Sequence, residues 1–354
     1  MVSNLKKSKI CLIYTGGTIG MHRDDNGILR PPTNVKSFLK IAPELNELAK
    51  FDFIELMNKD STNMNPSDWT KIANEIYANR NKNYDGFVIA HGTDTMHFSA
   101  SAVALALGKN LNFPVVFTGA QTAPDVRHGD ARVNLLRAFK VAAANIAEVV
   151  ICFGDYVFRG CRAQKKDERR FDAFDSPAFF PLAYVTEDII IGNLASKRKK
   201  DKKDIELKSE FATGIFQVSL IPGLEPELLS GFISNDKCHG IILQSFGAGN
   251  VPNLDSYSLT GFIKESTACG KPVLIASQFP ANATLHTAYE PGREAINAGA
   301  IPTGNMTSAC AMAKFRWVLA QVDEKSFRGK KRLGKIRKMM NKAYIGELDE
   351  KDSI

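Results

Sequence analysis

Hydroxyl-bearing and glycine residues follow several apolar segments of this chain, and such residues are able to carry out nucleophilic chemistry. The first group is Thr15-Gly16-Gly17-Thr18, and two others are Asp60-Ser61-Thr62 and His91-Gly92-Thr93-Asp94-Thr95. The loops Gly119-Ala120-Gln121 and Gly247-Ala248-Gly249-Asn250 have the same character. Ligands of open parallel sheets bind beyond the carboxyl ends of the strands. We therefore expect these loops to converge on one small ligand.

A threonine hydroxyl in such a cluster would be the nucleophile, and it needs a base that accepts its proton. His91 is one candidate, although we expect it to be a structural residue because it precedes the turn. A lysine that has lost its proton is the other kind of base, and the candidates are Lys165 and Lys166. Spacing in the sequence does not choose among these three.

Thr93 and Asp94 stand where an apolar segment runs into a helical pattern, and two interpretations are open. Either side chain could cap the helix through its oxygen. In the functional interpretation, N–H groups at the helix start stabilise an anion, and Asp94 pairs with a substrate ammonium. The segment 15–18 lacks both the GxGxxG pattern and the lysine of a phosphate-binding loop, which disfavours nucleotide binding.

The elements that must position these loops alternate in type along the chain. Short apolar runs rich in β-branched residues are each followed by a helical pattern, which predicts βαβ units and a parallel sheet. In the first half the predicted strands are 9–14, 51–57, 86–90, 113–118 and 148–153, and the predicted helices are 67–78, 95–107 and 131–144. In the second half the predicted strands are 214–221, 240–243 and 271–276, and the predicted helices are 256–269, 291–298 and 308–321.

The length of 354 residues favours two domains, because a single hydrophobic core seldom grows that large. Charged residues replace the apolar rhythm near residue 200. We therefore expect a catalytic α/β domain over 1–196, a linker over 197–212 and a second α/β domain over 213–354.

Composition is that of an ordinary globular protein, with 44% hydrophobic and 24% charged residues. The net charge of +8 is concentrated in 197–203 and 325–342, which we interpret as a solvated linker and an exposed helix rather than a nucleic-acid surface. Six scattered cysteines predict free thiols in a reducing compartment and no zinc site. The short apolar segment after the first lysines cannot serve as a signal peptide or membrane span, so we expect a cytoplasmic protein with no membrane partner.

Taken together, these motifs resemble those of the bacterial L-asparaginases, in particular their cytoplasmic type I branch. YTGGTIG, DSTNM, HGTDTM, GAQ, RAQK…FDAFDSP and FGAGN occur in the family's order and approximate spacing, and the resemblance covers nearly the whole chain. It implies an asparaginase-like fold with a Rossmann-like parallel N-terminal sheet and a smaller α/β C-terminal domain. It also implies hydrolysis of L-asparagine to L-aspartate and ammonia, without metal or cofactor, by a homotetramer made of two intimate dimers.

The same resemblance assigns roles to individual residues. Thr18 is the implied nucleophile, Thr93, Asp94 and Lys165 are its catalytic partners, and the alternative with Thr93 as nucleophile supported by Lys165 stays open. Asp94 would hold the α-amino group of the substrate, and main-chain N–H groups near Gly17 and Thr93 would stabilise the oxyanion. The implied substrate-binding residues are Gly17, Asp60, Ser61, Thr62, Thr93, Asp94, Ala120 and Asn250, of which Asn250 would reach the active site of the neighbouring subunit.

One departure from the family pattern concerns the lid that follows the first loop. A tyrosine is expected about ten residues after the nucleophile, but Ile28 stands there, and His22 is the nearest possible substitute. A catalytically weak amino-acid-binding regulator is therefore one alternative function. The other is the asparaginase-like amidase subunit of a tRNA-dependent amidotransferase. That subunit normally carries an extra N-terminal domain, whereas we expect the first strand here at about residue 9.

Overall fold

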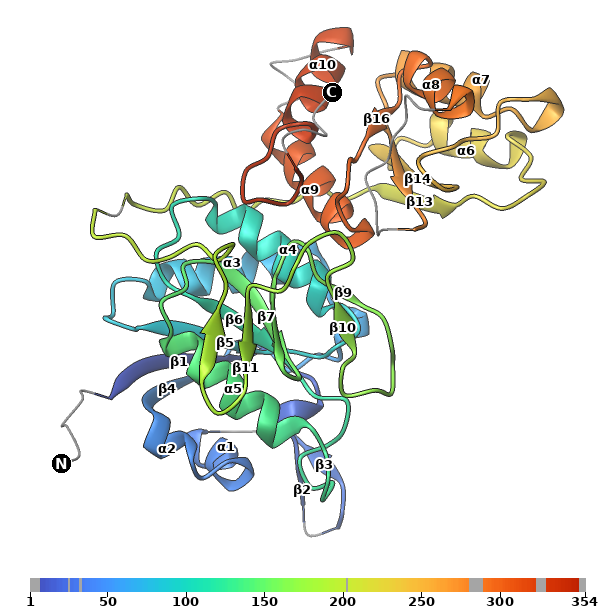
Figure 1. Cartoon of the computed structure of the whole chain (residues 1–354). Coiled ribbons are helices and arrows are strands. Elements are labelled where there is room, and N and C mark those ends of the chain that lie inside the picture. The colour runs from blue at the N-terminus through green and yellow to red at the C-terminus, as the bar shows by residue number, and fades with distance from the viewer. Residues whose placement is uncertain are drawn as a thin grey trace. The chain divides into compact units, whose positions relative to one another are not determined.

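The computed structural model of the chain describes residues 7–24, 26–31, 34–201, 203–279, 289–322 and 329–349. The chain divides into two compact units, Met1–Ser209 and Glu210–Ile354 (Figure 1). In the described residues the first unit contains an eight-stranded, mostly parallel sheet and the second a four-stranded parallel sheet. The predicted two-domain α/β fold with a parallel N-terminal sheet is confirmed.

The large sheet of the first unit has the order β12-β11-β8-β7-β6-β5-β1-β4. Its parallel part comprises β1 (Ser8–Tyr14), β4 (Ala49–Glu55), β5 (Gly86–Ala90), β6 (Val115–Thr118) and β7 (Val149–Phe153). An antiparallel part follows with β8 (Tyr156–Arg159), β11 (Ala183–Val185) and β12 (Ile189–Ile191). The central strands β5, β6 and β7 are buried along their whole length, which explains why they read as continuous apolar runs.

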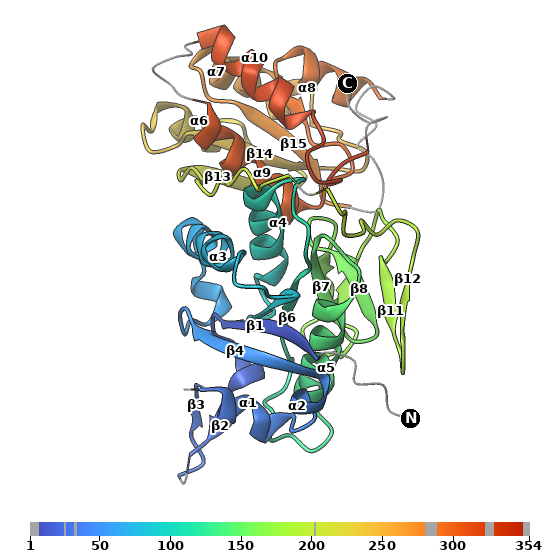
Figure 2. The ribbon, with the colours of Figure 1, turned by 90° about the vertical axis from the view of Figure 1, so that its left-hand side faces the viewer.

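Helices cover both faces of this sheet (Figure 2). One face carries α3 (Pro66–Asn79) and α4 (Met96–Leu107), and the other carries α5 (Ala131–Ala143) with α1 (Val35–Ile41) and α2 (Leu45–Leu48). The start of α3 is encoded locally. The Asn65 side chain accepts from the Ser67 N–H, and the Asp68 carboxylate accepts from the Asn65 N–H. The residue order therefore fixes where this helix begins.

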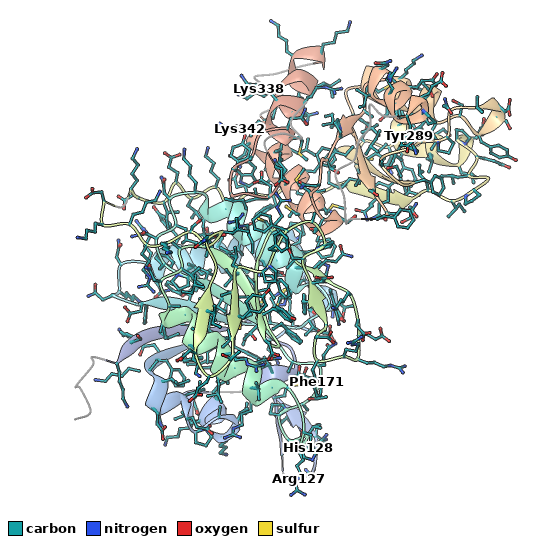
Figure 3. All side chains as sticks on the ribbon, in the orientation of Figure 1. Arg127, His128, Phe171, Tyr289, Lys338 and Lys342 are labelled. Carbon is teal, nitrogen blue, oxygen red and sulfur yellow. The ribbon has the colours of Figure 1, made fainter. Side chains whose placement is uncertain are left out.

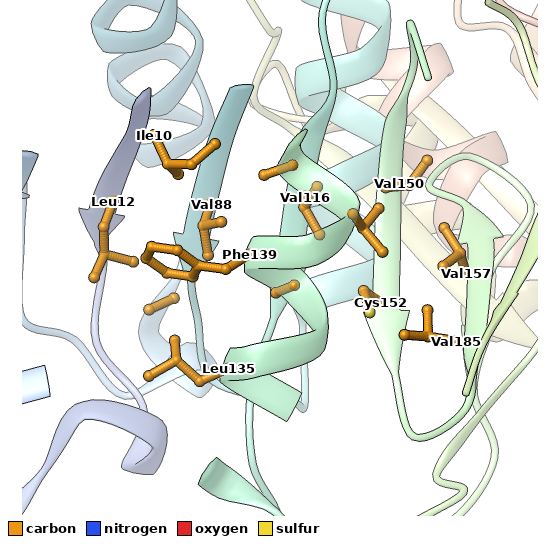
Figure 4. Close-up of a cluster of buried hydrophobic side chains, with 14 of the residues drawn as sticks. Ile10, Leu12, Val88, Val116, Leu135, Phe139, Val150, Cys152, Val157 and Val185 are labelled. Atoms are coloured by element: carbon orange, nitrogen blue, oxygen red, sulfur yellow. The ribbon is translucent and has the colours of Figure 1, made fainter. Parts of the chain in front are cut away.

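The core of the first unit lies between the sheet and α5 (Figure 4). Phe139 and Leu135 of α5 point toward Leu12 of β1 and Val88 of β5, and all four side chains are buried. Burial of one such side chain contributes about 1.5–3 kcal/mol. This packing holds β1 and β5 side by side, and both strands lead into loops of the candidate site.

Four adjacent strands, β4, β1, β5 and β6, bring their carboxyl ends to one edge of the sheet. Short elements follow at this edge. They are the 3-10 turns η1 (Thr18–Gly20) and η2 (Ser61–Asn63), the hairpin of β2 (His22–Arg23) and β3 (Leu29–Arg30), and the separate two-stranded ribbon of β9 (Gln164–Lys165) and β10 (Phe174–Asp175). Phe171, labelled in Figure 3, lies in the exposed loop of that ribbon.

The second unit has the parallel strands β13 (Ile215–Ser219), β14 (Gly240–Ser245), β15 (Val273–Ser277) and β16 (Ile301–Pro302) in chain order. Its helices are α6 (Glu227–Ser234), α7 (Thr260–Ala268), α8 (Glu290–Asn297), α9 (Ser308–Gln321) and α10 (Gly329–Met340), with the 3-10 turn η3 (Asp255–Tyr257) before α7. The helix predicted to start at residue 256 starts later, because Asp255 adopts a positive φ of 51° and the chain makes this separate turn first.

Residues 203–214 form no helix or strand, so the basic segment lies in irregular chain. One of its side chains is anchored rather than solvated. Arg198 donates to the carbonyls of Asp85 and Ala144 at 2.7 and 2.9 Å. Across the described residues, none of the helices has both the length and the apolar character needed to cross a bilayer.

Candidate active site

The loop after β1 makes a tight turn that only glycine permits. Gly17 has φ 83°, and a Cβ atom on it would lie 2.5 Å from the backbone nitrogen of Gly92. The Tyr14 hydroxyl donates to the Gly17 carbonyl at 3.1 Å and holds the turn. Thr15 is fully buried and donates to the Ala90 carbonyl at 3.0 Å. Thr15 is thus tied into the sheet, whereas Thr18 comes after the turn.

The Thr18 hydroxyl faces the loop after β6. Its Oγ1 donates to the carbonyl oxygen of Ala120 at 3.1 Å. Because β1 and β6 both flank β5, their carboxyl-end loops approach across the end of that strand. Thr18 and Ala120, 102 residues apart in the chain, are therefore in direct contact.

Lys165 joins the loop after β5 from the separate ribbon. Its Nζ donates to Thr93 Oγ1 at 2.9 Å and to Asp94 Oδ1 at 2.6 Å. The Lys165 side chain is 13% exposed, while that of Lys166 is 41% exposed and lies 3.6 Å from Asp172. The structure therefore brings Lys165 to Thr93 and Asp94, and it directs Lys166 away from them.

Neither Thr93 nor Asp94 occupies the capping position of α4. The N-cap residue is Thr95, which makes no capping hydrogen bond and instead donates to the Ser61 carbonyl at 2.7 Å. The Asp94 carboxylate pairs with Lys165. The capping interpretation of Thr93 and Asp94 is wrong, and their side chains point to the loops around them.

The segment after β4 packs against the loop after β5. Ser61 is 3% exposed, and a Cβ atom on Gly92 would lie 2.7 Å from Ser61 Oγ, so the close approach depends on that glycine. The Asp60 carboxylate accepts from the Thr62 hydroxyl and from the Thr62 N–H at 2.9 Å. These hydrogen bonds lower the pKa of Asp60. The exposed Asp60 and Thr62 leave polar groups at the rim of the site.

His91 is fully buried between β5 and α4 and belongs to the scaffold. Its Nδ1 lies 2.7 Å from the Gly92 carbonyl and its Nε2 lies 2.9 Å from Ser99 Oγ. A carbonyl only accepts, so Nδ1 carries the proton and Nε2 accepts from the serine hydroxyl. Burial lowers the pKa of His91 to about 4. Both ring nitrogens are occupied, which removes His91 as a candidate base for Thr18.

Gln121 is a site residue to which sequence reasoning gave no role. Its Oε1 accepts from Thr93 Oγ1 at 3.1 Å, and its Nε2 donates to the Asp167 carbonyl at 3.2 Å. Gln121 thereby connects the loop after β5 with the loop that follows Lys165. The available signal was its position directly after the strand-end pair Gly119-Ala120.

Two predicted features lie apart from this cluster. Asn250 belongs to the second unit, where its N–H donates to the Phe246 carbonyl at 2.8 Å in the turn after β14. Ile28, at the lid position, is 51% exposed in the β2–β3 hairpin, and Arg23 of that hairpin forms an ion pair with Asp125. The side chain of His22 lies outside the described residues. The residues that are described contain no group of three His, Cys, Asp or Glu side chains that could hold a metal ion.

Comparisons with known families agree with the motif order. Residues 9–197 match the family model "Asparaginase, N-terminal", and residues 215–328 match "Glutaminase/Asparaginase C-terminal domain". Among solved structures, the chain is similar to the thermostable L-asparaginase from Thermococcus kodakarensis, with a TM-score of 0.86, 29% identity and coverage of 96% of this chain and 99% of that one. It is also similar to L-asparaginase I from Vibrio cholerae, with a TM-score of 0.84, 30% identity and coverage of 97% and 99%.

Among sequence relatives, the chain is similar to one of the subunits of glutamyl-tRNA(Gln) amidotransferase. The protein of this name from Methanothermobacter thermautotrophicus is 31% identical over 353 residues, which cover 98% of this chain and 78% of that protein. Its counterpart from Saccharolobus solfataricus is 32% identical over 365 residues, which cover 100% and 79%. Similarity thus extends to two kinds of protein, one named for the hydrolysis of asparagine and one for an amidotransferase.

Proposed function

The chain belongs to the asparaginase family, and we propose from this premise that it hydrolyses the side-chain amide of L-asparagine to give L-aspartate and ammonia. The family fold supports amidohydrolase activity in general. The observation that carries the proposal is the contact of Lys165 with both Thr93 and Asp94, beside the loop that holds Thr18. This arrangement offers a nucleophile, a proton acceptor and a carboxylate for an ammonium group within one site.

Substrate recognition follows from the charges at the rim. Asp94, whose side chain is 57% exposed, would accept the α-ammonium of the substrate. The segment 60–62 would hold the α-carboxylate through hydroxyl and N–H groups, with Ser61 fixed against Gly92. An arriving ammonium also places a positive charge beside Lys165, which favours loss of a proton from that lysine. Substrate binding would thus prepare the base.

In the first chemical step Thr18 Oγ1 attacks the amide carbon of the substrate side chain, and its proton passes to the deprotonated Lys165 through Thr93. The C–N bond then breaks, the leaving group takes up a proton and ammonia departs. The product is a β-aspartyl ester on Thr18. Main-chain N–H groups near Gly17 and Thr93 would stabilise the oxyanion of this step.

In the second step water attacks the ester carbonyl. The C–O bond to Thr18 breaks, the threonine hydroxyl regains its proton and L-aspartate leaves. Thr18 is preferred over Thr93 as the nucleophile, because the Thr93 hydroxyl already bonds Lys165 and Gln121. Every residue used in these two steps lies in the first unit.

Replacement of Thr18 by alanine tests the proposal. We expect Thr18→Ala to abolish ammonia release from L-asparagine and to leave the unfolding midpoint nearly unchanged, because its one described hydrogen bond is to a loop carbonyl. Thr15→Ala is a matched control, since its hydroxyl also bonds a main-chain carbonyl but lies in the sheet. A Thr18→Ala variant with the wild-type rate, together with an inactive Thr93→Val variant, would overturn the nucleophile assignment.

A second candidate function is the amidase component of a tRNA-dependent amidotransferase. The named sequence relatives support this function more directly than they support free asparagine hydrolysis, whereas the solved structures support the asparaginase. The two differ in what activates the site. Full ammonia release by the purified chain alone favours hydrolysis of free asparagine. A requirement for a second protein and glutamyl-tRNA(Gln) favours the amidotransferase.

The remaining alternative is an amino-acid-binding regulator, and its motive is Ile28 in place of the lid tyrosine. Saturable L-aspartate binding without turnover would support it. We also propose assembly as a homotetramer in which Asn250 enters the site of a neighbouring subunit, as the resemblance to asparaginases implies. Light scattering gives the number of chains in the assembly, and restored activity on mixing Asn250→Ala and Thr18→Ala chains would show that sites are shared.

A further inference from the structure

The turn between β6 and α5 contacts both threonine hydroxyls of the candidate site. The Ala120 carbonyl accepts from Thr18 Oγ1, and the side-chain oxygen of its neighbour Gln121 accepts from Thr93 Oγ1, each at 3.1 Å. One tight turn therefore links the proposed nucleophile to the hydroxyl that receives a hydrogen bond from Lys165. Any movement of this turn would change both hydroxyls together.

The orientation of the Gln121 amide follows from its partners. Its nitrogen faces two main-chain carbonyls, those of Asp167 at 3.2 Å and Arg170 at 3.4 Å. Carbonyls accept and never donate, so the amide nitrogen must face them and the amide oxygen must face Thr93. The Thr93 hydroxyl can then only donate to Gln121, and its oxygen accepts from Lys165. The resting hydrogen bonds thus run in one direction, from Lys165 through Thr93 to Gln121.

The turn itself is held by a buried carboxylate. Asp130 is 5% exposed and accepts from the N–H groups of Gln121 and Thr122, at 2.9 and 3.1 Å, and from the Thr122 hydroxyl at 3.0 Å. Asn134 of α5 donates to the same carboxylate at 3.1 Å. Four donors therefore satisfy this buried charge, and two of them belong to the backbone of the turn.

Asp130 also stands at the N-cap position of α5, yet it makes no capping hydrogen bond. An aspartate at this position usually binds the first N–H groups of its own helix, which is worth about 0.5–2 kcal/mol. Here the carboxylate binds the turn instead. This choice of partners is local evidence that the turn geometry, and not the helix start, is what Asp130 secures.

We propose that Gln121 is a positioning residue for Thr93, and that Asp130 fixes Gln121 in its working position. The inference rests on the proposed amide hydrolysis. By holding the Thr93 proton, Gln121 keeps that hydroxyl from attacking the substrate and keeps its oxygen turned toward Lys165. Thr18, whose hydroxyl bonds only a carbonyl among its described contacts, is left as the group that attacks.

The test replaces Gln121 by methionine, which has a similar volume but accepts no comparable hydrogen bond. We expect kcat for L-asparagine to fall about tenfold, the rate equivalent of one hydrogen bond, and KM to stay within about twofold. Gln217→Met, a half-buried glutamine on β13, is the matched control and should keep both constants. Wild-type kcat in Gln121→Met, or a raised KM at unchanged kcat, would overturn the proposal.

A double-mutant cycle separates positioning from a general structural effect. If Gln121 acts through the Thr93 hydroxyl, Gln121→Met should cost nothing further in a Thr93→Val background, so the two effects do not multiply. Independent effects would contradict the proposal. Asp130→Asn should also lower kcat at constant KM, because its amide nitrogen would face the N–H donors of the turn.

The failure of this inference can be told from the failure of the proposed function. If the wild-type chain releases no ammonia from L-asparagine, amide hydrolysis of this substrate is wrong and the role of Gln121 falls with it. If the wild type is active, Thr18→Ala is inactive and Gln121→Met matches the wild type, only the positioning role is wrong.

Discussion

Replacement of Lys165 by methionine removes the group that connects the two halves of the proposed site. The ammonium of Lys165 donates to Thr93 Oγ1 at 2.9 Å and to Asp94 Oδ1 at 2.6 Å, and methionine can make neither bond. Loss of a positioned proton acceptor lowers kcat by about 10²–10⁴, which corresponds to about 3–5 kcal/mol of activation free energy. We expect ammonia release from L-asparagine to fall by that factor.

The same substitution should leave the fold intact. Asp94 would lose its ion-pair partner, but its side chain is 57% exposed and water can hydrate the carboxylate. Exposed pairs of this kind contribute about 0–1 kcal/mol, so the free energy of unfolding should change by no more than that. Urea denaturation measures this term, and a coupled assay for ammonia measures the rate.

Lys166→Met is the matched control, because it removes the same charge one residue away. The Lys166 side chain is 41% exposed and lies 3.6 Å from Asp172, away from Thr93. We expect this variant to keep the wild-type rate within about twofold, well below the effect of losing a general base. The assignment of Lys165 is refuted if Lys166→Met loses activity and Lys165→Met keeps it.

Three further predictions concern the scaffold. Gly17→Ala should lower the free energy of unfolding by about 1–3 kcal/mol in urea denaturation and slow ammonia release, because the new methyl group would meet the backbone of Gly92. Lys314→Met should lower it by about 3–5 kcal/mol in thermal denaturation, since the fully buried Glu347 would lose its partner at 2.7 Å, and an unchanged melting temperature would contradict this. The pKa of His91 is lowered to about 4 from 6.5, so the unfolded chain binds a proton that the folded chain does not. His91 should therefore destabilise the fold as pH falls from 6.5 to 4, by about 3 kcal/mol in all, and have no effect above 6.5. An NMR titration of the His91 ring with its midpoint near 6.5 would disprove this.

Much of the first unit follows from local sequence. The strands predicted at 9–14 and 86–90 are β1 and β5 almost to the residue, because fully buried parallel strands are continuous apolar runs. The start of α3 follows from its capping box. The hairpin β2–β3 and the ribbon β9–β10 carried no such signal. Their strands are two residues long, and periodicity needs a longer run to be recognised.

The sequence by itself determined which residue types stand at the strand ends, and hence that hydroxyls and a carboxylate would gather at one edge of the sheet. Only the tertiary structure decided which side chains touch. Successive residues of a strand point to opposite faces, so the ribbon turns Lys165 toward Asp94, 71 residues away in the chain, and turns Lys166 to solvent. The bond between Gln121 and Thr93 likewise joins two strand ends, and no local pattern encodes such a contact.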